Sequence, residues 1–370
     1  DDNELIDLDM QRQEMRDLVV HQVQAFMDLN YLLRHELVAS HLVHKRKDLL
    51  REIVGMLANL QRMGSMMRGV SKPPHTEDEK RIAALLPAEY QMLAVVVMLV
   101  TGFESNPPDV EDADASRKEA LQIVFDPLCE WLVKTSTEEK SVPRPGQEKS
   151  PVLVLPLHRL FSLFMNALIR KQYEVKPIFQ TLIGNSGPEE FSARVLSLIR
   201  HPLLLKQAVS AGLSDFTRAS PKVFELWTSN WYRWITDLDI NLLQFCLAAT
   251  GPLHFERAAF QCLLGHDGFS KEIWEDAKAR RSLEHCMMFL VQVLLERTGT
   301  GYTNRDQIRH EVLHILFAGD CSYSNIIEGV SKHGILNIEG RQDLGETPHI
   351  IAEVVREVAD FRPPSGTSQG

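Results

Sequence analysis

The chain has 370 residues, 44% of them hydrophobic, and a formal net charge of −10 at pH 7. A chain of this length folds into about two to three domains, and its apolar content is sufficient for a buried core. The acidic balance argues against a general nucleic-acid binder and against a protein that coats anionic membranes. The longest strongly apolar run, residues 92–100, is far shorter than the ~20 residues that span a bilayer. We therefore expect no membrane-spanning segment.

The cysteine pattern indicates a reducing compartment. The five cysteines lie far apart, at Cys129, Cys246, Cys262, Cys286 and Cys321. An odd, dispersed set is neither a disulfide framework nor a CxxC metal knuckle. The polar, acidic N-terminus is unlike a secretory signal peptide. We expect a cytoplasmic or nuclear protein, or one present in both, and no cofactor or metal in this chain.

Residues 1–133 are predicted to form an N-terminal helical scaffold. Apolar residues recur at helical spacing in four stretches, 18–43, 49–67, 88–100 and 120–133. The basic run at residues 44–47 is interpreted as a solvated helix end. Residues 104–116 are acidic and contain two prolines, but they lack the ordered Gly and terminal Glu of a calcium loop. They are interpreted as a solvated linker, not a metal site.

A change in composition predicts a flexible linker at residues 134–151. This stretch is rich in Thr, Ser, Pro and charged residues, which cannot bury enough apolar surface to become ordered. After an extended run at 152–155, Pro156 begins a second helical scaffold that is predicted to continue to residue 300. Its further expected helices are 191–199, 202–209, 222–235, 240–249 and 255–264. A helical bundle and a loose solenoid of helix pairs remain as alternatives.

The last part of the chain has the element order of a winged helix. An apolar stripe at Leu283, Met287, Leu290, Val291, Leu294 and Leu295 predicts one long helix before it. Helices are then expected at 306–316, after a cap at Ser322 or Ser324, and from Thr347-Pro348 to residue 358. An extended segment follows at residues 361–364. We expect an all-α chain ending in a winged-helix domain at 301–370 whose wing is truncated, and a fragment at both ends.

Several stretches resemble the central region of the N-recognin family, the RING-type ubiquitin-protein ligases that carry a UBR box. The stretches are Leu155-Pro156-Leu157-His158-Arg159, His201-Pro202-Leu203-Leu204-Leu205, Trp231-Tyr232-Arg233-Trp234, and residues 283–297 and 308–363. Asp28-Leu29-Asn30-Tyr31-Leu32-Leu33 is a weaker match. Together they span nearly the whole chain in the order that the family has.

The resemblance implies a scaffold for ubiquitin transfer in N-degron-dependent protein degradation. In the family, a zinc-bound UBR box captures the substrate and a zinc-dependent RING transfers ubiquitin, and both need Cys and His clusters that this chain lacks. The implied partners are other domains of the same ligase, a ubiquitin-conjugating enzyme and N-degron substrates. No catalytic, cofactor-binding or metal-binding residue carries over, so whether this segment counts as an enzyme stays open.

One motif offers a different function, that of a zinc metallopeptidase. Residues His310-Glu311-Val312-Leu313-His314 match H-E-x-x-H, in which two His hold zinc and the Glu acts as general base. A catalytic zinc also needs a third protein ligand. The extended motif fails at Phe317 and Asp320, which leaves Glu328, Glu346 and Glu353 as distant candidates. We expect both His on a solvated polar face.

The second alternative is a nucleic-acid-binding winged helix, with residues 347–360 as its recognition helix. That helix places Arg356 among Glu353, Glu357 and Asp360. An acidic helix is repelled by phosphates and lacks the side chains that read base edges. We therefore expect protein–protein scaffolding and no nucleic-acid partner.

Overall fold

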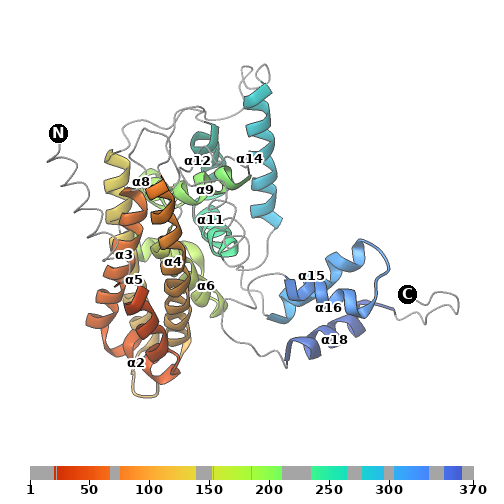
Figure 1. Cartoon of the computed structure of the whole chain (residues 1–370), viewed down its shortest axis with the longest axis horizontal. Coiled ribbons are helices and arrows are strands. Elements are labelled where there is room, and N and C mark those ends of the chain that lie inside the picture. Colours follow the sequence, from red (N-terminus) through yellow and green to blue (C-terminus); the bar gives the residue numbers. More distant parts are fainter. Residues whose placement is uncertain are drawn as a thin grey trace.

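The computed structural model describes residues 21–66, 76–138, 152–210, 235–264, 277–295, 304–332 and 346–360, except residues 22, 153 and 185. Every regular element within these ranges is an α-helix, which confirms the expected helical class for this part of the chain (Figure 1). Within the same ranges, no helix has both the length and the apolarity needed to cross a membrane. The predicted aromatic helix at 222–234 and the segment at 361–364 lie outside the described residues.

The first helices follow a helical stretch at residues 23–33. They are α2 (Glu36–Lys45), α3 (Lys47–Met66), α4 (Thr76–Glu104) and α5 (Ala113–Glu138). The expected helix 18–43 is thus interrupted at residues 34–35, and α5 continues past residue 133 into the stretch predicted to be a linker. Residues 139–150 lie outside the described part of the chain.

The later helices include most of those expected and one, α7, that the sequence analysis did not predict. They are α6 (Pro156–Arg170), α7 (Val175–Ile183), α8 (Pro188–Ser197), α9 (Arg200–Ser210), α11 (Thr236–Thr250), α12 (Pro252–Leu264) and α14 (Ala277–Leu295). Val152, Val154 and Leu155, just before α6, are buried but belong to no strand. For these described residues, the prediction of a β-like run is therefore correct in the apolar character only.

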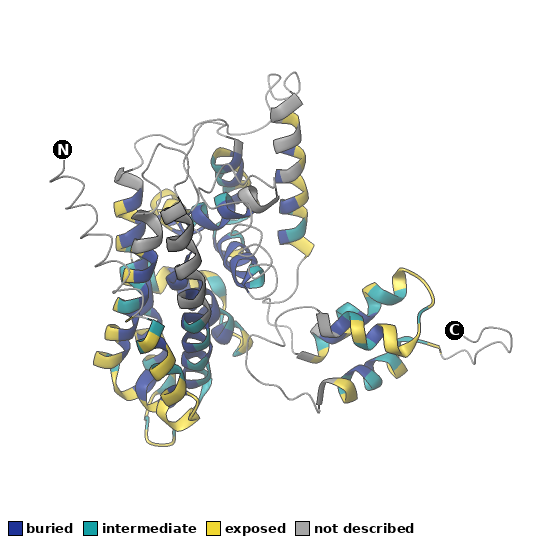
Figure 2. Cartoon of the chain, in the orientation of Figure 1, coloured by how far each residue is buried: buried dark blue, intermediate teal, exposed yellow. Residues whose placement is uncertain are grey.

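Helix α6 lies at the centre of the larger core. Twelve of its fifteen residues are buried. It packs against α3, α4 and α5, which precede it in the sequence, and against α11, which follows it. The helices on both sides of residues 134–151 thus share one hydrophobic cluster (Figure 2). The buried residues of α6 include the polar His158, Arg159 and Ser162, so these side chains need partners from the surrounding helices.

Three helices form a separate C-terminal module, α15 (Asn304–Phe317), α16 (Tyr323–Lys332) and α18 (Glu346–Val358). Its own core contains Ile308, Val312, Ile326, Val330, Ile351 and Val354. Ser322 caps α16, because its Oγ accepts the Asn325 N–H at 3.2 Å. Helix α18 begins at Glu346, two residues before Pro348, which was expected to be its first residue. Pro348 is tolerated there because N–H groups in the first turn have no partner within the helix.

The outward face of α14 differs from the prediction. The structure buries Leu283, Cys286, Phe289 and Val293, whereas four of the six residues expected in the apolar stripe are exposed. The exposed residues of α14 that are apolar are Met287, Met288, Val291, Leu294 and Leu295. Periodicity thus predicted the long helix correctly but did not identify which apolar side chains meet the core, because apolar residues occur on more than one side of this helix.

Helices α2 and α4 approach each other so closely that only glycine fits between them. A Cβ added at Gly102 would lie 2.4 Å from the backbone C and O of Ala39, and 2.9 Å from the Ser40 N. Backbone atoms cannot move aside as a flexible side chain can, so any larger residue would separate the two helices.

We predict that Gly102→Ala lowers the free energy of unfolding by about 1–3 kcal/mol, because it overpacks this contact. Urea unfolding followed by circular dichroism would measure the change. Gly55→Ala is a matched control, because Gly55 lies in α3 with no atom within 4 Å of the added Cβ. The control should be neutral or stabilising by up to about 1 kcal/mol. Equal stability of the Gly102 variant and the wild type would contradict the close approach.

Candidate functional site

The start of α6 connects α6 to α3 through a buried hydrogen bond. Pro156 occupies the first helical position, where its missing N–H costs no intrahelical bond. The next N–H, that of Leu157, donates to Gln61 Oε1 of α3 at 3.1 Å. His158 Nδ1 lies 3.5 Å from the same oxygen. A free amide at a helix start is thus satisfied by a side chain from a segment far away in sequence.

Arg159, one residue further, joins three helices through buried charges. It is 0% exposed, and the two carboxylates beside it, Glu89 of α4 and Asp239 of α11, are 4% and 3% exposed. Arg159 Nη1 donates to Glu89 Oε1, and its Nε lies 3.5 Å from Asp239 Oδ1. Charges buried this deeply are stable only when they are paired, so the position of each helix depends on the other two.

An aromatic cluster surrounds His158. Its ring centroid lies 5.5 Å from Trp131 of α5 and 6.3 Å from His201 of α9, and Trp131 and His201 are 4.6 Å apart. Burial, together with the positive charge of Arg159, lowers the pKa of His158 to about 3. The ring is therefore neutral at pH 7. Two stretches that carry the family resemblance, at residues 155–159 and 201–205, meet in this cluster and serve packing.

The basic run at residues 44–47 lies at the end of α2, and Lys45 and Arg46 are exposed as expected, but the run also makes structural contacts. His44 is buried, and burial first and then the charge of Arg117 lower its pKa to about 4. Lys45 forms an ion pair with Asp109 at 2.7 Å, and Lys47 donates to the Ser116 carbonyl at 2.6 Å. The run thus holds the loop before α5.

Residues 105–112 connect α4 to α5, and none of them is buried, as expected for a solvated linker. The structure adds that specific contacts at both ends hold this connection. The guanidinium of Arg117 donates to the carbonyls of Phe103 at 2.8 Å and Ser105 at 2.6 Å, which closes the C-terminal end of α4. Asp112 accepts the Ala115 N–H at 2.8 Å and so caps α5. The acidic residues act as caps and ion-pair partners because the adjacent helix ends need them.

The C-terminal module carries ion pairs on its surface. Arg305 of α15 donates to Glu353 of α18 at 2.7 Å and to Glu357 at 2.9 Å, and Arg309 lies 3.4 Å from Glu357. Much of the negative charge of the expected recognition helix therefore faces α15. Arg356 is exposed on the same helix.

The H-E-x-x-H residues lie on α15, away from the module core. Ile308 and Val312 are buried, whereas His310 is half-buried and His314 is exposed, which confirms the expected polar face. The two His Nε2 atoms are 3.2 Å apart. Within the described ranges, no group of three His, Cys, Asp or Glu side chains could hold a metal ion.

The glutamates considered as a third zinc ligand do not join His310 and His314 in a metal site. Glu353 is paired with Arg305, and Glu328 is exposed on α16. The side chain of Glu346 lies outside the described residues. The arrangement of the described side chains therefore does not support hydrolysis by a bound zinc, which requires three protein ligands and an open position.

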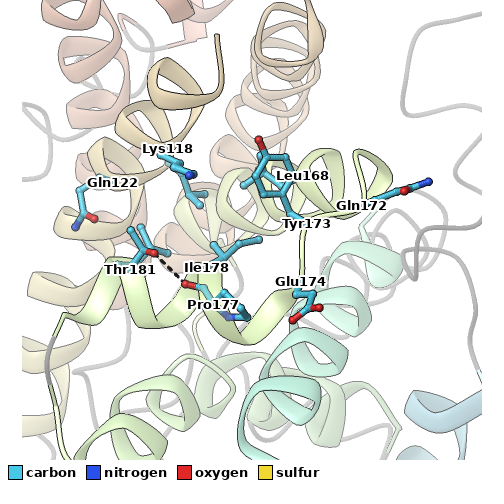
Figure 3. A pocket seen from close by; sticks show the side chains of 11 residues that line it. Lys118, Gln122, Leu168, Gln172, Tyr173, Glu174, Pro177, Ile178 and Thr181 are labelled. Atoms are coloured by element: carbon cyan, nitrogen blue, oxygen red, sulfur yellow. Dashed lines mark hydrogen bonds between the residues drawn. The ribbon is translucent and has the colours of Figure 1, made fainter. Parts of the chain in front are cut away.

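A pocket of about 330 Å³ lies between α5, α6 and α7 (Figure 3). Its apolar wall includes Leu121, Leu168, Ile178 and Leu182. Tyr173 lies at its edge, where burial and a hydrogen bond to Asp114 raise the pKa of the phenol to about 12. The Thr181 hydroxyl donates to the Pro177 carbonyl at 3.0 Å. The sequence contained no signal for this pocket, because its walls come from separate helices.

The partners of Arg159 were also missed from the sequence. Glu89 and Asp239 each stand next to apolar helical stretches, and a charge in such a position is the only signal that a single chain offers. It indicates that a partner is needed, but it does not say which one.

Comparison with known proteins gives distant relatives of one kind. The chain is 26% identical to the E3 ubiquitin-protein ligase PRT6 of Arabidopsis thaliana over 242 residues, which are 58% of this chain and 11% of that protein. It is 23% identical to the mouse E3 ubiquitin-protein ligase UBR3 and 21% identical to the human one, in each case over 69% of this chain and 13% of the relative. No family model and no solved structure matches. The chain is thus a distant relative of E3 ubiquitin-protein ligases and spans a small part of their length.

We predict that Arg159→Met lowers the free energy of unfolding by about 3–5 kcal/mol, because it leaves buried carboxylates without their cation. Chemical denaturation would measure this loss. Arg170→Met is the matched control on the same helix, because its ion pair with Glu104 is partly exposed. The control should cost about 0–1 kcal/mol. A similar cost for both variants would contradict the role given to the buried charges.

We also predict that stability falls on acidification between about pH 6.5 and pH 3. The pKa of His158 is lowered to about 3 in the folded chain, whereas an unfolded His titrates near 6.5. The unfolded chain therefore binds the extra proton first, and stability present above about pH 6.5 is lost as pH falls. The free energy of unfolding, measured at several pH values, should change less steeply with pH in His158→Gln than in the wild type. The same dependence on pH in both proteins would exclude His158 as a contributor to the loss of stability in acid.

Proposed function

We propose that this chain is an internal, non-catalytic scaffold of an N-recognin-type E3 ubiquitin ligase that acts in N-degron-dependent degradation. The observation that carries the proposal is the similarity to PRT6 and UBR3 over more than half of the chain. In this proposal, a UBR box and a RING outside the chain hold zinc, bind the substrate and transfer ubiquitin. The chain sets the distance and angle between them.

The described interior supports a mechanical role. Buried polar groups at the start of α6 connect α3, α4, α6 and α11, so these helices cannot slide past one another without exposing unpaired charges. The contacts between Leu157 and Gln61, and between Arg159 and its two carboxylates, join different helices of the chain. Such a body resists deformation, which is what a spacer between two sites must do.

The C-terminal module is proposed to be a winged helix whose partners are proteins. Its three helices have the expected order and their own core. Carboxylates of α18 pair with Arg305 and Arg309 of α15. An acidic helix of this kind does not attract the phosphates of a nucleic acid. We propose contacts with other domains of the ligase and, through the whole protein, with a ubiquitin-conjugating enzyme and N-degron substrates.

The cysteines support a location in the cytoplasm or the nucleus. None of the five, all of which lie in the described part of the chain, forms a disulfide. Burial raises the pKa of the Cys129 and Cys286 thiols to about 12, so these groups stay protonated and unreactive. Cysteines that form no disulfide suit a reducing compartment.

We predict that Val354→Pro in the longer ligase lowers substrate ubiquitylation and leaves degron-peptide binding by its UBR box intact. Val354 is buried in the module core, and Pro removes a helix hydrogen bond at a cost of about 3 kcal/mol or more. Ubiquitylation assays and peptide-binding titrations would separate the two effects. Arg356→Ala, at an exposed position of the same helix, should leave both unchanged.

Two outcomes would contradict the proposal. One is unchanged ubiquitylation by the Val354→Pro variant, which would show that the module has no role in transfer. The other is discharge of ubiquitin from a charged conjugating enzyme by the 370-residue chain alone, which would place catalytic groups within it.

A further inference from the structure

The Nε2 atoms of His310 and His314, both on α15, point toward each other. Their Nε2 atoms are 3.2 Å apart, whereas their ring centroids are 4.4 Å apart. Because the nitrogens are closer together than the ring centres, the two rings face each other with their Nε2 atoms. Both side chains lie on the polar face of the helix, where solvent can reach them.

We propose that His310 and His314 form a two-ligand site for a divalent transition metal of the kind that imidazole binds, namely Cu²⁺, Ni²⁺ or Zn²⁺. With metal–nitrogen bonds of about 2.0–2.1 Å, two nitrogens on a tetrahedral metal are about 3.3 Å apart. On a square-planar metal, adjacent nitrogens are about 2.9 Å apart. The observed separation lies between these values, so a metal requires only small ring rotations.

The surroundings permit a cation at this position. Arg309, the neighbour of His310, lies 3.4 Å from Glu357, and Arg305 is paired with Glu353 and Glu357. Their positive charges are thus compensated by α18. A carboxylate of the same α18 surface, Glu353, also lies 3.4 Å from His349. These two arginines therefore add no uncompensated positive charge to α15 that would oppose a metal ion.

This site differs from a catalytic zinc centre. Within the described ranges no third ligand completes it, so water or a group from a partner would occupy the remaining positions. Such a site holds an exchangeable ion and does not retain one through purification. Because the two His are one turn apart, the metal would bridge one turn of α15, whose opposite face buries Ile308 and Val312. Metal binding to the folded form alone would stabilise the module.

The test uses the full 370-residue chain, stripped with chelator and dialysed. Isothermal titration with CuCl₂, NiCl₂ and ZnCl₂ should give the strongest binding for Cu²⁺. Either His310→Gln or His314→Gln should weaken the Cu²⁺ affinity by about tenfold or more. His349→Gln, which removes an exposed His from α18, is the control and should not change it.

Electron paramagnetic resonance of the Cu²⁺-loaded chain adds a readout of the ligands themselves. Two imidazole nitrogens should be present in the wild type and in the control, and fewer in either single variant at this site. The proposal is overturned if both single variants bind as the wild type does. It is equally overturned if the only binding is adventitious, at other histidines, so that the control loses as much affinity as the site variants.

Discussion

The pairing of Arg159 with Glu89 and Asp239 constrains the whole helical body. A guanidinium with no exposed surface cannot be left unpaired, so α4, α6 and α11 must meet where their charges coincide. Replacing such a group by apolar residues is often neutral for stability, whereas removing one member is costly. The pairing therefore contributes more to the choice of one helix arrangement than to the total free energy of folding.

Around this centre the polar contacts are directional and the apolar ones are not. The Leu157 N–H finds Gln61, and the neutral ring of His158 packs against Trp131 and His201. Apolar side chains on both sides then fill one continuous core. Directional contacts at the middle of a large, nondirectional core fix the register of helices that could otherwise rotate against one another.

The C-terminal module uses the opposite arrangement. Its core is small and apolar, and its charges lie on the surface between α15 and α18. Exposed pairs of this kind contribute little stability, so the module depends on a few residues such as Ile351 and Val354. A small unit of this kind, beside a larger body with buried polar contacts, suits a scaffold in which one part is stiff and another presents surface to partners.

The stretches that resemble the N-recognin family have a physical meaning in this fold. Residues 155–159 and 201–205 supply packing, a helix start and buried charge, and none of them is arranged as a catalytic group. The resemblance therefore concerns how the body is built. This agrees with relatives that are E3 ubiquitin-protein ligases but that match this chain over only 11–13% of their own length.

The sequence alone determined the helical class, most helix positions, a serine cap at Ser322 or Ser324 and the polar face of His310 and His314, because these depend on local periodicity and on neighbouring residues. Tertiary structure decided which side of α14 is buried, how the loop at 104–116 is held, and which carboxylates meet Arg159. These features join residues that are distant along the chain. A buried charge indicates that it needs a partner, but only the packing of the helices determines which side chain lies within reach.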